Sequence, residues 1–252
     1  MCLRFYCMIV LLSMYASPVM AETAFERSES LIAAGQITEA RRALRAELRL
    51  RPDHIEARYN LALLLQDIDH RADAMVLYKQ NLAMAWHLPS LVNLVNILQQ
   101  QGKAIEARRW LFKATKKFRN EAVPWYLLAK MDEKNGDVAA GQRHFQRAIK
   151  ADPLNGFAWL YLAEFQSRQQ HGDQALKSAA KAMRLLPACA ACWQIYGGLL
   201  EQQKAHQQAL LAYQRSLAIQ PTDKTRRELI VTLHSLGEHQ RADMMQRSLG
   251  KR

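Results

Sequence analysis

The fold is decided by residues 122–155, which read AVPWYLLAKMDEKNGDVAAGQRHFQRAIKADPLN. The next stretch, residues 156–189, has the same length and reads GFAWLYLAEFQSRQQHGDQALKSAAKAMRLLPAC. Two residue types recur at intervals of 34 residues, tryptophan at Trp125, Trp159 and Trp193 and proline at Pro153, Pro187 and Pro221. A fixed period of this size indicates that one supersecondary unit is repeated along the chain.

Small residues keep the same period, at Ala129, Ala163 and Gly197, at Gly141, Ala175 and Ala209, and at Ala148, Ala182 and Ser216. Small side chains let two helix backbones approach closely, which predicts a pair of helices in each unit. In the unit after Pro153, Asn155 is placed to cap a first helix, and Gly172 with Asp173 predicts the break. Residues 174–186 then predict a second helix, which Pro187 ends. One such pair cannot bury its own apolar face, so neighbouring pairs must stack.

The same 34-residue spacing extends in both directions, with residues that match the pattern less closely. It predicts six near-complete units and one terminal unit, with bounds of about 21–54, 55–87, 88–121, 122–155, 156–189, 190–222 and 223–252. The chain has 252 residues, of which half are hydrophobic and 23% are charged, and this excludes a disordered tail or a collagen-like fibre. We therefore expect an all-α fold.

The order Trp, Leu–Gly/Ala, Tyr, Gly, Ala, Phe/Tyr, Ala, Pro at this spacing resembles the tetratricopeptide repeat, over roughly residues 22–252. The resemblance implies a right-handed superhelical solenoid of antiparallel helix pairs that acts as a non-catalytic scaffold. The sequence departs from the family pattern at four positions. Trp86 and Arg119 stand in place of the terminal proline, and Gln170 and Lys204 stand where glycine is usual.

In this family the first helix of each unit lines a concave groove, which commonly holds an extended peptide or a helix. The repeated positions of the pattern account for the residues that each first helix buries in the core. The remaining residues at helical spacing form a ridge along the helix. This ridge predicts the partner-binding residues Tyr59, Leu63, Asn96, Tyr126, Lys130, Leu160, Glu164 and Gln194. Aromatic anchors beside amides suit a peptide that buries apolar side chains and hydrogen-bonds through its backbone. The alternative is that some of these residues pack against a neighbouring unit. The slots of Tyr59, Leu63 and Asn96 lack the Lys, Asn and Arg set with which some family members clamp a terminal carboxylate.

The N-terminal segment, residues 1–21, has the pattern of a secretory signal peptide. Arg4 precedes an apolar run from Phe5 to Tyr15, and small residues precede an expected cleavage after Ala21. The alternative is an uncleaved anchor, although a membrane-spanning helix needs about 20 apolar residues and Pro18 interrupts this run. The pattern predicts an exported, periplasmic protein whose repeat domain covers residues 22–252.

Cys189 and Cys192 would sit at the start of a first helix, where the spacing allows a structural disulfide or a redox-active dithiol. The disulfide is the preferred interpretation, because a Cys pair outside a thioredoxin-like strand–helix context is weak support for catalysis. The eight histidines show no zinc-site spacing. We expect no catalytic residues, no metal site and no cofactor.

The formal net charge is +12, and two basic clusters fall on predicted second helices, which face away from the groove. Their members are Arg41, Arg42, Arg45, Arg49 and Arg51, and then Arg108, Arg109, Lys113, Lys116, Lys117 and Arg119. They predict a solvated convex face or, as the alternative, a contact with an acidic partner or anionic lipid. No nucleic-acid partner is expected in an exported protein.

The function predicted from the sequence is therefore a periplasmic scaffold that binds a polypeptide in its concave groove. Its expected role is to assist assembly of an envelope complex such as a pilus, a secretion channel, a cytochrome or a polysaccharide exporter. Two alternatives stay open: a thiol-redox protein that uses Cys189 and Cys192, and a scaffold that self-assembles into a homo-oligomer.

Overall fold

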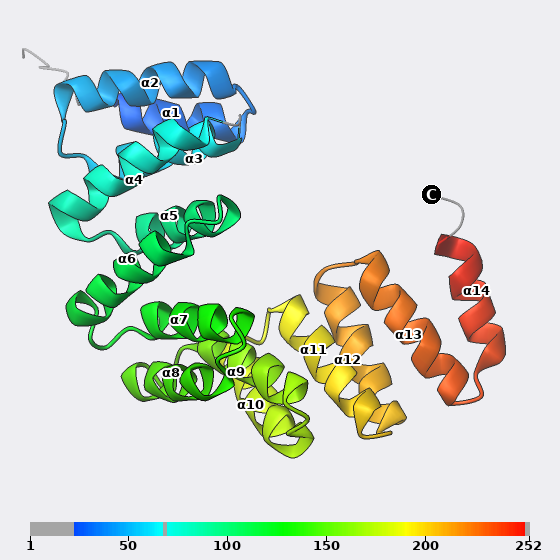
Figure 1. Ribbon diagram of the computed structural model, residues 1–252. Helices are drawn as coiled ribbons and strands as arrows, with labels where there is room; N and C mark the ends of the chain where they lie inside the picture. The colour runs from blue at the N-terminus through cyan, green and yellow to red at the C-terminus, as the bar shows by residue number, and fades with distance from the viewer. Residues whose placement is uncertain (1–22, 68–69, 250–252) are drawn as a thin grey trace, which may run out of the picture. The chain divides into compact units, whose positions relative to one another are not determined.

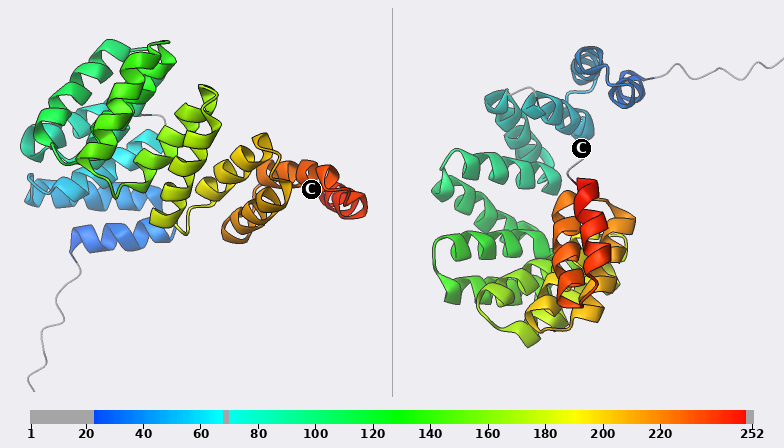
Figure 2. Two further views of the ribbon diagram at one scale, coloured as in Figure 1. Left: turned by 90° about the horizontal axis from the view of Figure 1, so that it is seen from below. Right: turned by 90° about the vertical axis from the view of Figure 1, so that its right-hand side faces the viewer.

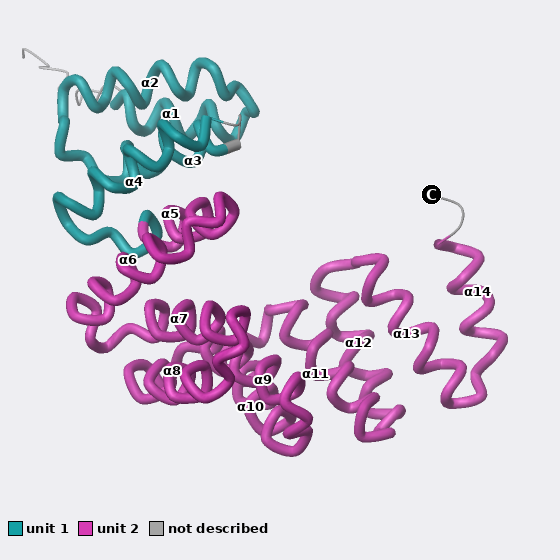
Figure 3. Tube along the Cα trace, in the orientation of Figure 1, with its two compact units in different colours: residues 1–90 teal, residues 91–252 magenta. Residues whose placement is uncertain are grey.

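The computed structural model describes residues 23–67 and 70–249, and in these ranges every regular element is an α-helix (Figure 1). The predicted signal peptide, residues 1–21, lies outside the described residues. The chain divides into two compact units, residues 1–90 and 91–252 (Figure 3). The described helices follow one another in pairs joined by short turns, and the prediction of an all-α fold of helix pairs is confirmed (Figure 2).

The described residues of the first unit form the helices α1 (Ala24–Ala33), α2 (Ile37–Leu50), α3 (Ile55–Asp67) and α4 (Arg71–Ala85). Helix α5 (Leu88–Gln100) crosses the boundary between the units. The rest of the second unit contains α6 (Ala104–Lys117), α7 (Ala122–Lys134), α8 (Val138–Ala151), α9 (Gly156–Arg168), α10 (Gly172–Leu185), α11 (Ala190–Gln202), α12 (His206–Ile219), α13 (Asp223–Ser235) and α14 (His239–Leu249). Each of the seven ranges expected from the sequence contains one pair of consecutive helices.

The turns inside several pairs depend on one residue with a left-handed backbone. Gly136 has this conformation between α7 and α8, with φ of 80°. Gln170 and Lys204 occupy the same slot in the next two units, with φ of 62° and 58°. The predicted break at Gly172 and Asp173 is therefore wrong, because Gln170 makes the turn and Gly172 already begins α10.

The small-residue slots bring paired helices together, and the facing side chain differs in size from one pair to the next. Ala129 of α7 packs with Phe145 of α8, and Ala163 of α9 packs with Ala179 of α10. Gly197 of α11 lies so close to Tyr213 of α12 that an added Cβ atom would be 2.7 Å from its ring. The 34-residue pattern of small residues is therefore a pattern of close helix contacts.

Polar bonds also join the two helices of a pair, and in three pairs one such bond links residues twelve apart. Gln66 Oε1 accepts from the Tyr78 hydroxyl at 3.1 Å, and Gln166 Oε1 accepts from the Ser178 hydroxyl at 2.7 Å. Asp132 and His144 form the corresponding bond between α7 and α8 at 2.5 Å. These bonds satisfy polar groups that the pairing of the helices buries.

Candidate functional site

The first helices of the later repeats, α9, α11 and α13, together line a pocket of about 200 Å³ in the second unit. Its lining residues are Glu164, Ser167, Arg168, Gln194, Ile195, Gly198, Leu199, Gln202, Lys224 and Glu228. The repeat explains this convergence, because Glu164 and Gly198 are one period apart, as are Gln194 and Glu228. The floor includes the aliphatic side chains of Ile195 and Leu199, and the rim is polar.

An aromatic cluster lies on the two first helices at the α7 side of this pocket. The ring centroids of Tyr126 on α7 and Tyr161 on α9 are 5.0 Å apart. The ammonium of Lys130 lies over the Tyr161 ring, 4.1 Å from its centroid, in a cation–π geometry. Burial, reinforced by Tyr161, raises the pKa of Tyr126 from its ordinary value of 10.0 to about 12.

Charged groups on this surface are held in place by one another. Arg168 donates from Nε and Nη2 to the two carboxylate oxygens of Glu133, at 2.6 and 2.8 Å. This hydrogen bonding raises the pKa of Arg168. Gln194 Nε2 donates to Glu228 Oε2 at 2.8 Å, which ties α11 to α13. The result is a rim of fixed donors and acceptors around an aliphatic floor.

Four of the predicted groove residues belong to this surface. Glu164 and Gln194 line the pocket, Tyr126 is half-buried in the aromatic cluster, and the exposed Lys130 covers it. Leu160 does not belong, because it is only 4% exposed and packs with Ala182 and Cys192. The prediction that Leu160 is available to a partner is thus corrected.

The remaining predicted residues lie elsewhere. Asn96 is exposed on α5. Leu63, on α3 in the first unit, lines a separate pocket of about 410 Å³ with Glu29, Ile32, Ala33, Asn60 and Leu64. The Tyr59 ring contacts the His87 ring, with centroids 5.0 Å apart. Tyr59 and Leu63 therefore belong to the first unit, and the other six predicted residues belong to the second.

The sequence reasoning missed Tyr161, Arg168, Lys224 and Glu228, which belong to the aromatic cluster and the pocket. For two of them the signal was present, since Glu228 is one period after Gln194 and Arg168 is four positions, or about one helical turn, after Glu164. Tyr161 stands beside Leu160 in the sequence, and only the side-chain packing distinguishes the two.

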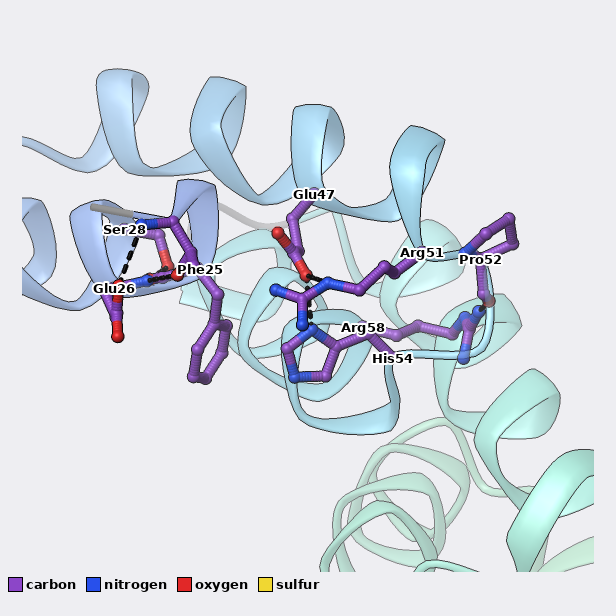
Figure 4. Close-up of polar contacts among 9 residues, drawn as sticks. Phe25, Glu26, Ser28, Glu47, Arg51, Pro52, His54 and Arg58 are labelled. Atoms are coloured by element: carbon purple, nitrogen blue, oxygen red, sulfur yellow. Dashed lines mark hydrogen bonds and ion pairs between the residues drawn. The ribbon is translucent and has the colours of Figure 1, made fainter. Parts of the chain in front are cut away.

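Buried carboxylates on other faces are paired with arginine and histidine. Figure 4 shows Glu47 of α2 pointing towards Arg51 and His54, with a contact of 2.5 Å to Arg51 Nε and 2.6 Å to His54 Nδ1. In the second unit Asp132 is paired with Arg108 and His144. His54 and His144 are half-buried and bonded to these carboxylates. Among the described residues no group of three potential ligands has the geometry of a metal site.

Cys189 is the N-cap residue of α11, and its Sγ accepts from the backbone N–H of Cys192 at 3.1 Å. One period earlier, Asn155 Oδ1 caps α9 in the same way by accepting from Ala158 N–H. The Cα atoms of the two cysteines are 5.3 Å apart, a separation that a disulfide spans, and the side chains are placed as a bonded pair. Cys192 is fully buried, which leaves it poorly accessible to a substrate.

Sequence comparison identifies the tetratricopeptide repeat in three segments of the chain, residues 25–66, 122–165 and 166–224. No curated protein matches the sequence. Among solved structures, the chain is similar to one in the crystal structure of the APC/C hetero-tetramer Cut9–Hcn1, with a TM-score of 0.63 and 19% identity. The match covers 83% of the present chain and 42% of that chain, and at this identity it shows the fold alone.

Proposed function

Since the chain belongs to the tetratricopeptide repeat family, whose members generally act as scaffolds for protein partners, we propose that it binds an extended polypeptide on the first helices of its later repeats. We name this the α7–α13 surface, and define it by Tyr126, Lys130, Glu133, Tyr161 and the pocket residues between α9 and α13. The observation that carries the proposal is the convergence of equivalent slots from successive repeats on one pocket.

The chemistry of this surface suits a peptide backbone with interspersed apolar and acidic side chains. Ser167, Gln194 and Gln202 offer hydroxyl and amide groups that both donate and accept hydrogen bonds. Ile195 and Leu199 provide the apolar floor, while Lys130 and Lys224 offer cations at the two ends. A partner that runs along the surface would meet these groups in the order of the repeats.

The test compares the native chain with the double variant Lys130→Glu, Lys224→Glu in a cross-linking pulldown. Both lysines are exposed, so the variant should keep its helicity and lose the captured partner. The matched control is Lys177→Glu, Arg215→Glu, which makes the same charge change on exposed positions of second helices. Loss of the partner in the control as well would assign the effect to net charge and refute the proposed surface.

We further propose that the protein works in the periplasm, as an assembly factor for an envelope complex. The support is the signal-peptide pattern of residues 1–21. In the part of the chain that the structure describes, no helix has the length and hydrophobicity needed to cross a membrane. Intact mass of the protein recovered from a periplasmic extract should correspond to residues 22–252, and a mass that includes residues 1–21 would argue against cleavage.

A redox function for Cys189 and Cys192 is the competing candidate from another class. Two observations favour a structural disulfide: the side chain of Cys192 is fully buried, and Cys189 caps helix α11. Under that proposal the chain should not accelerate reduction of a disulfide substrate by dithiothreitol, and mass spectrometry without reductant should show the pair oxidised. Turnover that Cys189→Ser abolishes would support the redox alternative.

A further inference from the structure

A second pocket in the later unit has a different chemistry from the α7–α13 surface and shares no residue with it. Its volume is about 380 Å³, and it lies between the α6–α7 connection and the C-terminal half of α8. The lining residues are Arg119, Asn120, Trp125, Arg147, Lys150 and Ala151. Three of the six side chains are cationic and none is acidic, so the pocket favours an anion.

Trp125 holds one of these cations in position. The Arg147 guanidinium lies over the indole ring, with Cζ 5.1 Å from the centroid. This cation–π contact restricts the arginine without neutralising its charge. The carboxylate of Asp152 accepts from the backbone N–H of Leu154 at 3.1 Å and is not part of the lining. Glu121, the other nearby acid in the sequence, is not part of the lining.

The repeat supplies an internal comparison for the tryptophan. In the next two units, the indole N–H of Trp159 donates to the carbonyl of Pro153 at 2.9 Å, and that of Trp193 donates to Pro187 at 3.1 Å. Arg119 takes the place of this proline in the unit of Trp125. Within the described residues, the Trp125 indole N–H forms no hydrogen bond, so it offers a donor at the pocket.

The same comparison shows that the cations gather in one unit. One period later, Lys181 and Arg184 occupy the positions equivalent to Arg147 and Lys150. However, Arg184 Nε contacts the carbonyl of Ala180, and a proline occupies the position equivalent to Arg119. Two periods later Ala218 replaces Lys150. Among these three units, the combination of three cations with an unengaged indole donor therefore occurs only at the pocket of Trp125.

We propose that this Trp125 pocket is a binding site for a phosphate group. A phosphate presents oxygens in several directions, so it can accept from two guanidinium groups, an ammonium and an indole N–H at once. The oxygens of a carboxylate lie in one plane and match fewer of these donors. The phosphate could belong to a lipid headgroup or to a soluble phosphorylated compound, and the shared chemistry is what the pocket recognises. The proposal is independent of the proposed peptide surface.

The experiment follows the indole N–H resonances of the full chain, labelled with ¹⁵N-tryptophan, during titration with inorganic phosphate. Sodium chloride of equal ionic strength is the reference, because screening alone would affect all exposed cations. The resonance missing from the Trp125→Phe variant should shift saturably, while those of Trp159 and Trp193 should stay in place because their N–H groups are bonded to proline carbonyls.

Two variants test the residues of the site. Arg147→Gln should weaken phosphate binding about tenfold, the loss expected for one charge-assisted hydrogen bond. Arg119→Pro restores the residue of the later units and should weaken binding similarly. The preceding backbone accepts this change, since Phe118 has φ and ψ of −103° and 65°, close to the −129° and 65° of Leu186 before Pro187. Arg215→Gln, in the slot of Arg147 two periods on, is the matched control and should leave binding unchanged.

Vesicles distinguish the source of the phosphate. A Trp125-selective response to phosphatidylglycerol vesicles that phosphatidylcholine vesicles do not produce would assign a lipid headgroup. A response to free phosphate without vesicle binding would assign a soluble phosphate compound. The proposal is overturned if neither probe acts on Trp125, if all tryptophans respond alike, or if Arg215→Gln weakens binding as much as Arg147→Gln.

Discussion

At the scale of single residues, Asp132 illustrates how this fold accommodates a buried charge. Its side chain is 1% exposed and accepts hydrogen bonds from Arg108 of α6 and His144 of α8. Removing the charge from such a cluster leaves the partner cation without its counterion, which costs about 3 kcal/mol. We therefore predict that Asp132→Asn lowers the local unfolding free energy of α7 and α8 by about this amount, measured by hydrogen exchange.

Asp137 provides the control for that prediction. It is an exposed N-cap residue whose carboxylate accepts from Ala140 N–H at 2.9 Å. Asparagine caps helices about as well as aspartate, so Asp137→Asn should change the unfolding free energy by only a few tenths of a kcal/mol. Equal effects of the two changes would contradict the role assigned to Asp132.

Glu47 carries a prediction about pH. Burial by itself would raise the pKa of this carboxyl, but hydrogen bonds from Arg51 and His54 outweigh it and lower the pKa below its ordinary value of 4.5. The stability contributed by the ionised form is therefore fully present above pH 4.5 and is lost as the pH falls through the lower folded-state pKa. Hydrogen exchange of α2 should show the native chain more stable than Glu47→Gln above pH 4.5, with the difference shrinking below it. A pH-independent difference would contradict this linkage.

The packing of individual side chains is also what the sequence could not predict. The period placed Leu160 in the slot of Tyr126, but a slot does not fix what packs around it. Leu160 is buried against Ala182 and Cys192, and Tyr161 forms the ring contact with Tyr126 instead. The role of Asp132 could not be predicted from the sequence either, because a carboxylate in a helix is ordinarily solvated. Its partners Arg108 and His144 come from two other helices.

At the scale of the helix pair, the fit between α11 and α12 depends on Gly197. A Cβ atom there would lie 2.7 to 3.0 Å from three ring atoms of Tyr213, which is 2% exposed and cannot easily move. We predict that Gly197→Ala destabilises this pair by about 1–3 kcal/mol, the usual cost of overpacking. Thermal unfolding followed by circular dichroism, with hydrogen exchange to locate the effect, measures the loss.

Gly198 is the matched control. Its added Cβ atom would meet only the Tyr213 hydroxyl, at 3.6 Å, which is an ordinary contact. Alanine is favoured over glycine in a helix interior by up to about 1 kcal/mol, so Gly198→Ala should be neutral or stabilising. If Gly197→Ala were tolerated as well as Gly198→Ala, the size complementarity across this pair would be refuted.

The existence of helix pairs followed directly from the sequence, because proline, glycine and small residues act locally and recur with a fixed period. The exact turn in the fifth unit did not follow. Glycine is the usual left-handed residue, so Gly172 was the natural choice, yet Gln170 adopts that conformation and the turn is closed by His171 N–H donating to the Gln166 carbonyl at 2.9 Å. Helix packing on both sides imposes a backbone that the local sequence disfavours.

At the scale of the whole molecule, the period predicts the number of pairs but not the division into two units. That division falls after Ser90, close to Trp86, where the terminal proline of the repeat is missing and the backbone is left-handed with φ of 50°. The sequence matches the repeat pattern least closely in this region, and a poor match does not show how well neighbouring helix pairs pack. Sequence therefore predicts the repeating element better than the assembly of elements.

The architecture predicts how a local defect spreads. In the described part of the chain, the substantial contacts join helices that are one or two places apart in sequence. Phe165 of α9 is fully buried with Ala129, Phe145 and Leu162, so Phe165→Ala should destabilise this region by about 3–5 kcal/mol. In a repeat protein stability is a sum of pair and nearest-neighbour contributions. Hydrogen exchange should therefore accelerate in α7 to α10 and stay at its native rate in α1 to α3.

The reciprocal variant, Leu44→Ala, removes a fully buried side chain from α2 and should give the opposite pattern. Exchange should accelerate in α1 to α3 and stay unchanged in α9 and α10, because the substantial contacts of α2 in the described chain are with α1 and α3. If either substitution accelerated exchange uniformly from α1 to α14, the chain would unfold as one cooperative body. The sum over neighbouring pairs would then be the wrong description of its stability.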